Sequence, residues 1–294
     1  MELFFDIETI PDQTPGARNA FVDAAMENME SGEFKAPSGM TKGKALDELR
    51  PLYPEPEHAK LEALTKDQVI ELWVENFKSR AGDERIAKAE EEGDKNWRLT
   101  ALDGARGELA VIGFAFDREE PQAFTRNGPT AADEIALIQG FFDMLRQRLG
   151  TDGGTVTTPR MINHNIKGFD LPFVWKRAVI RNIVPPFNLQ FKRFDDNIYC
   201  TMETWAGFGN RIKLEKLCNA LGIESPKQNG LDGSKVWDFV SSGRIGEVAD
   251  YCKEDVFATC NCYYRMTFAP IVERPQVAHN GENWMDSEND QPSE

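Results

Sequence analysis

The apolar pattern of the chain begins with its clearest strand. Leu, Phe, Phe and Ile crowd the first seven residues, which is typical of a strand buried on both faces in the middle of a sheet. Two acids, Asp6 and Glu8, stand at its far end, and residues i and i+2 of a strand point to the same side. Buried carboxylates need a counter-charge, for which a divalent cation is the commonest source. The alternative is that the strand ends at Phe5 and both acids are solvated.

From residue 11 to about residue 104 the pattern changes to charged and helical. A capping box at 65–68 starts a helix, and a second, exposed helix is expected over 83–92. Four apolar residues share one face of the first helix: Val69, Leu72, Trp73 and Phe77. The stretch before it predicts loop with one short helix at 44–49. Because it carries no chemical motif, we interpret 11–104 as a helical insertion after the first strand.

Strand periodicity returns at 108–116 and 122–126, which predicts a hairpin. A helix begins at Thr130 and ends at Gly150. Further elements are expected at six places: strands at 160–165 and 196–201, and helices from 169, at 213–221, from 236 and at 245–268. From Gln276 onward the chain holds five acids and no Lys or Arg, so we expect 271–294 to be an acidic, disordered tail.

Composition narrows the class of protein. With 294 residues and 40% hydrophobic content the chain can bury a core, and it has neither a long apolar run nor a basic leader. We therefore expect a soluble, cytoplasmic protein that does not enter membranes. Five cysteines without a C-x-x-C pair, and three scattered histidines, argue against a zinc site.

The net charge of -15 argues against generic, salt-driven binding to nucleic acid. Charge is uneven, however: ten basic residues and five acids lie between Arg160 and Lys216. This region can still face a polyanion, although a solvated helix surface would give a similar count.

Two further acids lie in apolar surroundings. Asp170 stands inside a Phe-Asp-Leu-Pro-Phe run, and Asp255 follows Tyr251 by four residues on the last helix, so carboxylate and phenol share a face. Asp170 could instead be a helix N-cap, and Tyr251 with Asp255 could be a surface pair. Four acids in three separated apolar segments favour a common role.

In chain order, these segments resemble the three exonuclease motifs of the DEDD, or DnaQ-like, 3′-5′ exonuclease superfamily: Phe5-Asp6-Ile7-Glu8-Thr9, Asn165-x-x-x-Phe169-Asp170 and Tyr251-x-x-x-Asp255. The resemblance is strongest to the proofreading domains of family B DNA polymerases and to stand-alone bacterial or phage relatives. It covers 1–10 and 105–270.

The subclass can also be inferred. A histidine subclass carries its imidazole five residues before the last Asp, but here that position is Asp250. Tyr251 stands where the tyrosine subclass, DEDDy, has its phenol.

The resemblance implies a ribonuclease H-like α/β fold with a mixed, about five-stranded sheet flanked by helices. It also implies that four acids hold two Mg²⁺ or Mn²⁺ ions about 3.5 to 4 Å apart on the scissile phosphate: Asp6, Glu8, Asp170 and Asp255. Tyr251 would orient the attacking water. The terminal nucleotide would meet Thr9, through its backbone, and Asn165, with Phe169 or Phe173 wedging or stacking there.

The sequence thus predicts an exonuclease that degrades single-stranded DNA from its 3′ end, in DNA replication or repair. A 3′-5′ exoribonuclease is a second possibility, because the motifs do not report the 2′-hydroxyl group. A third is an interaction protein whose insertion docks on a replication or repair partner, with secondary nuclease activity.

Overall fold

The central strand of the molecule is β1 (Glu2–Ile10), as the apolar pattern predicts. In a computed structural model, which describes residues 1–29, 34–152, 155–189, 195–226 and 231–274, it belongs to a five-stranded sheet of order β3-β2-β1-β6-β7. The other strands are β2 (Glu108–Phe116), β3 (Gln122–Thr125), β6 (Arg160–Asn163) and β7 (Ile198–Cys200). The expected acidic tail lies almost entirely outside the described residues.

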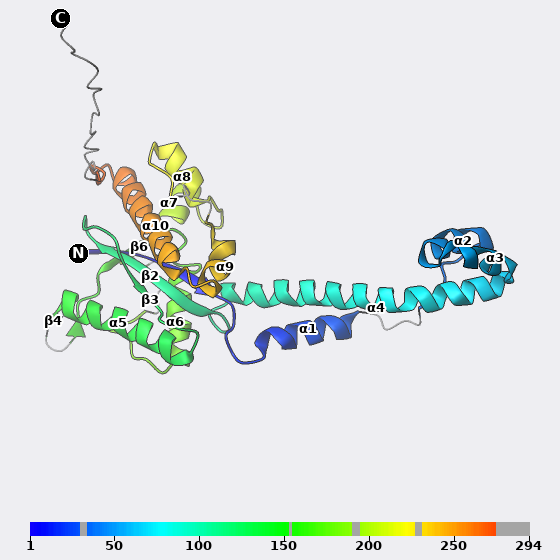
Figure 1. Cartoon of the computed structure of the whole chain (residues 1–294). Helices are drawn as coiled ribbons and strands as arrows, with labels where there is room; N and C mark the ends of the chain where they lie inside the picture. The colour runs from blue at the N-terminus through cyan, green and yellow to red at the C-terminus, as the bar shows by residue number, and fades with distance from the viewer. Residues whose placement is uncertain (30–33, 153–154, 190–194, 227–230, 275–294) are drawn as a thin grey trace, which may run out of the picture.

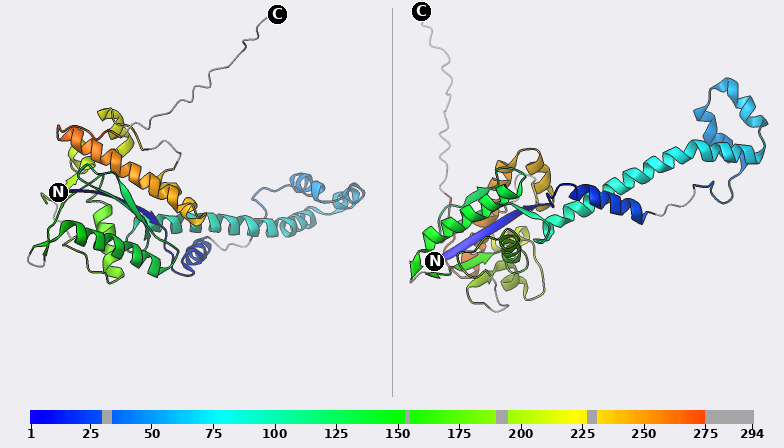
Figure 2. Two further views of the ribbon diagram at one scale, coloured as in Figure 1. Left: turned by 60° about the vertical axis from the view of Figure 1, so that its left-hand side comes forward. Right: turned by 90° about the horizontal axis from the view of Figure 1, so that it is seen from below.

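The sheet is mixed. β1 runs antiparallel to β2 and parallel to β6, β2 and β3 form the predicted hairpin, and β6 runs parallel to β7. Helices cover both faces, α5 (Ala131–Leu149) and α6 (Asp170–Ile180) on one and α10 (Ile245–Met266) on the other (Figures 1 and 2). This confirms the predicted ribonuclease H-like fold class.

Alternate residues of β1 belong to different cores. Leu3, Phe5 and Ile7 pack with α5 and α6, whereas Phe4 packs against Tyr263 and other residues of α10. A strand buried on both faces needs such an uninterrupted apolar run, which is why the sequence identified it.

The smaller elements complete the body. They are β4 (Thr151–Asp152), β5 (Thr155–Val156), α7 (Thr201–Ala206), α8 (Leu214–Leu221), η3 (Gly233–Lys235) and α9 (Val236–Ser241). The predicted start of α5 is confirmed, because the Thr130 and Asp133 side chains each bond to the other residue's backbone N–H. Gly222 ends α8 in the left-handed conformation, with φ of +67°.

Within the described residues, no helix has the length and apolar content to cross a bilayer.

The insertion forms an arm (Figure 1). Its elements are α1 (Ala17–Asn28), α2 (Lys42–Leu49), η1 (Arg50–Leu52), α3 (Glu55–Ala63), α4 (Lys66–Leu99) and η2 (Thr100–Leu102). The capping box at Thr65 is confirmed. The expected separate helix over 83–92 is wrong, because α4 continues through Gly82 for 34 residues, roughly 50 Å at 1.5 Å per residue.

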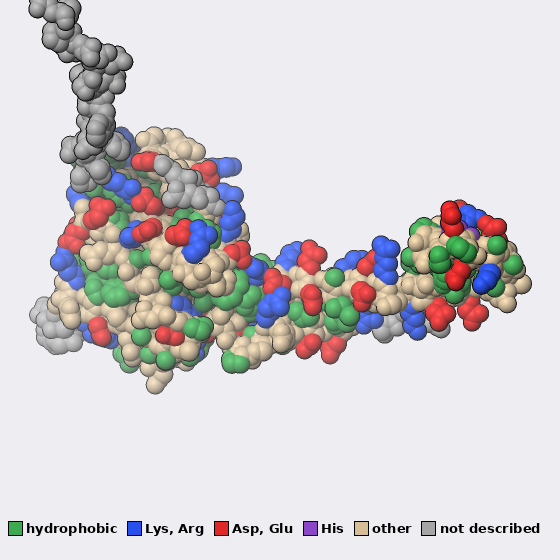
Figure 3. Space-filling view, viewed as in Figure 1, with side chains coloured by type: hydrophobic (Ala, Val, Ile, Leu, Met, Phe, Trp, Pro, Cys, Tyr) green, Lys and Arg blue, Asp and Glu red, His purple; other side chains and the backbone are tan. Residues whose placement is uncertain are grey.

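Different helices pack against the two ends of α4. At the far end, α2 and α3 with the first turns of α4 enclose a small apolar core that includes Leu46, Leu61 and Trp73, and we call this unit the tip lobe. Nearer the body, α1 packs so closely on α4 that a Cβ at Gly93 would lie 2.6 Å from the Val22 Cα. Acidic and basic side chains are mixed along the arm (Figure 3).

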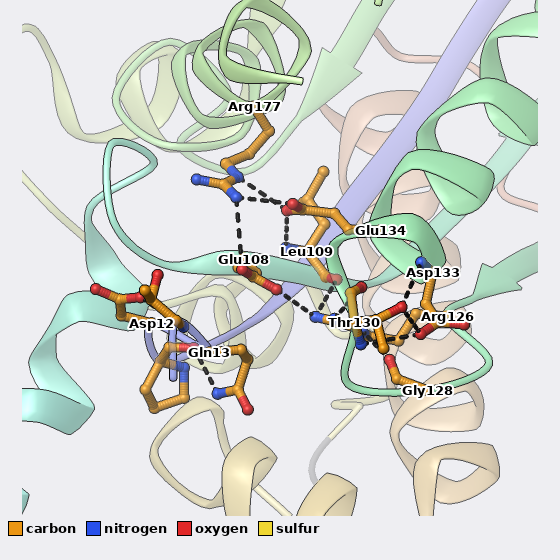
Figure 4. Close-up of polar contacts among 12 residues, drawn as sticks. Asp12, Gln13, Glu108, Leu109, Arg126, Gly128, Thr130, Asp133, Glu134 and Arg177 are labelled. Atoms are coloured by element: carbon orange, nitrogen blue, oxygen red, sulfur yellow. Dashed lines mark hydrogen bonds and ion pairs between the residues drawn. The ribbon is translucent and has the colours of Figure 1, made fainter. Parts of the chain in front are cut away.

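A buried ion-pair network of five residues joins β2, α5 and α6: Glu108, Arg126, Glu134, Arg177 and Arg181 (Figure 4 shows four of them). Glu134 accepts from Arg177 Nη2 at 2.7 Å and from Arg181 Nε at 2.6 Å, and it also accepts from the Leu109 N–H. The network fixes α6, which carries Asp170 at its first turn, against the sheet.

Candidate active site

Asp6 and Glu8 lie on the face of β1 that α10 covers. The helix approaches closely there because Gly113, which pairs with Asp6 across the β1–β2 ladder, has no side chain. A Cβ at Gly113 would lie 2.8 Å from the Cys252 Sγ of α10. The β1–β2 register shifts between Glu8 and Thr9, as in a β-bulge, and bulges re-aim side chains near active sites. The reading in which the strand ends at Phe5 with both acids solvated is wrong.

Asp170 comes from α6, which packs on the opposite face of the sheet from α10, and its charge acts on Asp6. It is the first residue of α6 and is 2% exposed, while the N-cap position belongs to Phe169. The alternative role of Asp170 as an N-cap is therefore wrong. Asn163, at the end of β6, donates from Nδ2 to Asp6 Oδ1 at 3.0 Å and also hydrogen-bonds Asp170.

Tyr251 and Asp255 complete the cluster from α10. The Tyr251 hydroxyl donates to the Asp255 carboxylate one helical turn away. Burial, followed by the charges of Asp255, Glu8 and Asp6, raises the pKa of the phenol far above its usual value. The two side chains thus face the other acids, which argues against an ordinary surface pair.

The carboxylates repel one another. Burial, with the charge of Asp170 next, raises the pKa of Asp6 from 3.8 to about 7. Burial also raises the pKa of Asp170 to about 7, with Asp255 adding to the effect, and the pKa of Glu8 is raised well above its usual value by burial and then by the other three acids. The fold therefore holds these acids closer together than their charges favour when all of them are ionised.

Cys252 is a neighbour that sequence reasoning missed. Its Sγ lies 3.7 Å from Asp6 Oδ2, and Asp6, Glu8 and Cys252 present possible ligand atoms within 4.8 Å of one another. Burial, and then the charge of Asp6, raises the pKa of the thiol well above its usual value. A protonated thiol is a poor metal ligand, so Cys252 acts as a weak hydrogen-bond donor to Asp6.

The four residues predicted to touch substrate lie in three places. Asn165, with a left-handed φ of +67°, and the half-buried Phe169 share the turn before α6. Thr9 is on β1, where its hydroxyl donates to the Ala101 carbonyl of the insertion at 2.7 Å. Phe173 is 2% exposed and packs in the core below Phe169, with ring centroids 5.5 Å apart.

A family model for predicted 3′-5′ exonucleases related to the exonuclease domain of PolB matches residues 110–273, more than half of the chain. The chain belongs to this family. The match includes Asp170, Tyr251 and Asp255. It begins after β1, so Asp6 and Glu8 lie outside the matched residues and are joined to the other acids by the structure alone. The resemblance stated from the motifs is confirmed at the level of the PolB exonuclease domain.

One solved structure is also similar to part of the chain. The family B DNA polymerase from the hyperthermophilic archaeon Pyrobaculum calidifontis matches with 16% identity and a TM-score of 0.43, over 56% of this chain and 22% of that chain. The matched part of this chain thus spans only 22% of the length of the polymerase. Among curated proteins, none matches the sequence.

Proposed function

We propose that this protein is a two-metal-ion exonuclease that removes nucleotides from the 3′ end of single-stranded DNA. The observation that carries the proposal is the convergence of four carboxylates from β1, α6 and α10, three segments far apart in the sequence. Membership in a family of predicted 3′-5′ exonucleases supplies the reaction class and its direction.

The chemistry of the cluster fits divalent cations. Hard carboxylate oxygens are the ligands that Mg²⁺ and Mn²⁺ prefer. The pKa values of Asp6, Glu8 and Asp170 are raised by burial and then by neighbouring acids, and bound cations would offset both effects. Asp6, Glu8, Asp170 and Asp255 would hold the ions, which as Lewis acids supply stabilisation of the attacking and leaving oxygens. Asn163, a neutral amide, keeps Asp6 and Asp170 in position without adding charge.

Tyr251 would position the attacking water. Its raised pKa keeps the phenol protonated at neutral pH, so it is a poor base. Because its proton is donated to Asp255, its oxygen would accept a hydrogen bond from the attacking water. The bond to Asp255 fixes the orientation of the hydroxyl group. This role corresponds to the tyrosine subclass.

The terminal nucleotide would contact residues on both sides of the acids. The backbone of Thr9 follows Glu8 on β1, and Asn165 with the partly exposed ring of Phe169 lies in the turn before Asp170. Phe173, which is buried, would support Phe169 from the core.

The proposal is tested with matched, 5′-labelled single strands of DNA and RNA, incubated with Mg²⁺, Mn²⁺ or a chelator. We expect a ladder of DNA fragments shortened from the 3′ end, and no ladder with the chelator. Faster digestion of RNA would favour the exoribonuclease. If neither strand is shortened with either metal, the proposal is wrong.

A further inference from the structure

Gly113 of β2 lies against Cys252 of α10, on the sheet face that carries Asp6 and Glu8. Gly113 pairs with Asp6 across the β1–β2 ladder, and paired residues of neighbouring strands present their side chains on the same face. A side chain at position 113 would therefore point at α10, as the carboxylate of Asp6 does. The contact between Gly113 and Cys252 thus belongs to the same strand-to-helix layer as the candidate metal ligands.

The Cys252 side chain fills the space between the strand and the helix. A Cβ at Gly113 would lie 2.8 Å from Cys252 Sγ, 3.3 Å from the Cys252 carbonyl carbon and 3.2 Å from Val256 Cγ2. Cys252 and Val256 are both 0% exposed, so neither side chain has free space to turn into. One added methyl group at position 113 would therefore push α10 away from the sheet, by about 0.6 Å if the thiol contact is to reach ordinary van der Waals distance.

The same cysteine also contacts Asp6. Its Sγ lies 3.7 Å from Asp6 Oδ2 and 3.5 Å from the Asp6 carbonyl oxygen. Asn163 Nδ2 donates to the other carboxylate oxygen, Oδ1, at 3.0 Å. Each carboxylate oxygen of Asp6 is thus held by a neutral group, one from β6 and one from α10, and such partners fix the orientation of a metal ligand.

The residues of α10 that approach Gly113 are chain neighbours of those that face the candidate site. Cys252 follows Tyr251 in the chain. Val256, the second residue that approaches Gly113, follows Asp255. A displacement of α10 at this contact would therefore carry Asp255 away from the acids of β1. The separation between the carboxylates of β1 and the carboxylate of α10 thus depends on the size of the side chains at positions 113 and 252.

We infer that Cys252, packed against Gly113, is a positioning residue that sets the separation of the carboxylates and hence the size of the cation that the site accepts. The inference rests on the proposed function and adds to it the residues that determine metal selectivity. Mg²⁺ needs near-ideal octahedral geometry with oxygens at about 2.0 to 2.1 Å, whereas Ca²⁺ accepts flexible geometry at about 2.3 to 2.6 Å. A displacement of about 0.6 Å is as large as the widest difference between these distances, so it would disfavour Mg²⁺ more than Ca²⁺.

The test measures cation binding without nucleic acid. After Mn²⁺ affinity is measured for each protein, Mg²⁺ and Ca²⁺ are each titrated against bound Mn²⁺, and the electron paramagnetic resonance signal of free Mn²⁺ reports its displacement. Changing a group that orients a metal ligand typically costs about 10- to 100-fold in affinity, so Gly113→Ala should bind Mg²⁺ about 10-fold more weakly and Ca²⁺ within about 3-fold of wild type. Cys252→Val, which adds bulk to the same contact from the helix, should shift the ratio of the two affinities in the same direction.

Two further variants separate positioning from ordinary packing. Gly113→Ala/Cys252→Ala relieves the contact, so it should bind Mg²⁺ more tightly than Gly113→Ala alone, whereas two independent defects would add. Gly93→Ala creates a comparable contact in the arm, 2.6 Å from the Val22 Cα. It should lower thermal stability while the ratio of Mg²⁺ to Ca²⁺ affinity stays at the wild-type value.

An unchanged affinity ratio in whichever of the two variants folds, Gly113→Ala or Cys252→Val, would overturn the inference, as would additive losses in the double variant. Shortening of DNA by wild type alongside that result would leave the proposed exonuclease intact. Conversely, a shifted ratio together with no shortening of DNA or RNA by wild type would support the positioning role of Cys252 and overturn the proposed function.

Discussion

We expect the free energy of unfolding of the metal-free protein to depend on pH, because the clustered acids bind protons in the folded state. The pKa values of Asp6 and Asp170 are about 7 in the folded protein, against 3.8 ordinarily. Between these values the folded state holds protons that the unfolded chain releases. Their contribution to the free energy of unfolding is therefore present at pH 4 and is lost as pH rises to 7.

Replacing Asp6 with Asn should remove part of this dependence. With a chelator present, Asp6→Asn should unfold at nearly the wild-type temperature near pH 4 and at a higher temperature near pH 7. Thermal unfolding of both proteins across this window checks the expectation. Asp143→Asn, an exposed residue of α5, serves as the control, and an Asp6→Asn protein less stable than wild type at pH 7 would contradict it.

The role of Tyr251 distinguishes a tyrosine-type exonuclease from a site in which the metal ions act without a positioning phenol. Tyr251→Phe keeps the ring and loses the hydroxyl, so we expect about 10²-fold slower cleavage with unchanged Mn²⁺ binding. Tyr251→His should not restore activity, because the histidine subclass places its imidazole one residue earlier, a rotation of about 100° around the helix. The role of Tyr251 is checked by measuring single-turnover cleavage and Mn²⁺ binding for each variant. An unchanged cleavage rate would exclude Tyr251 from the mechanism, and lost Mn²⁺ binding would assign it a structural role.

The four acids of the candidate site were found from the sequence in two ways. Asp6, Glu8 and Asp170 interrupt apolar segments, and Asp255 follows Tyr251 by one helical turn. Asn163 and Cys252 could not be found in this way, since neither has a local pattern that distinguishes it from its neighbours. Asn163 reaches Asp6 only because β6 pairs in parallel with β1. Cys252 reaches Asp6 only because Gly113 lets α10 approach β2.

Among the elements, α6 depends on the ion-pair network that holds it against the sheet. Glu134→Gln would leave the buried guanidinium group of Arg177 and the partly exposed one of Arg181 short of negative charge, and breaking a buried pair typically costs about 3 to 5 kcal/mol. Chemical denaturation should reveal a loss of this order. Asp143→Asn, in an exposed pair on the same helix, should cost less than about 1 kcal/mol. Equal losses in the two variants would show that the network does not stabilise α6.

Helix starts were easier to predict than helix lengths. Capping boxes at Thr65 and Thr130 are local signals, and both are confirmed. The continuity of α4 is not local: Gly82 costs the helix only about 1 kcal/mol, and packing at the two ends of α4, by the tip lobe and by α1, can outweigh that cost.

At the scale of the whole molecule, the arm separates the tip lobe from the candidate active site. The tip lobe has its own core, and on the face of the arm that Figure 3 shows, acidic and basic side chains are mixed without a continuous basic surface. We propose that 11–104 is an accessory unit, with its body-proximal end next to β1 and its tip lobe free to dock on a replication or repair protein.

Removal of the tip lobe tests this division. A variant in which a short Gly/Ser loop replaces residues 30–85 keeps α1 and the α4 segment around Gly93. It should fold and cleave a short oligonucleotide within about 2-fold of wild type, because no residue of the tip-lobe core belongs to a body core. Loss of cleavage on short oligonucleotides by a folded variant would contradict the separation, whereas changed partner capture or preference for long substrates would support it.

The convergence of four acids on one metal-dependent reaction is tested most directly by single-turnover cleavage of a 5′-labelled single DNA strand with Mn²⁺. Wild type is compared with four single alanine variants, at Asp6, Glu8, Asp170 and Asp255. We predict a 3′-shortened ladder for wild type and a loss of about 10³-fold or more in each variant, with every variant folded. Wild-type rates in any two of the four variants would contradict the assignment.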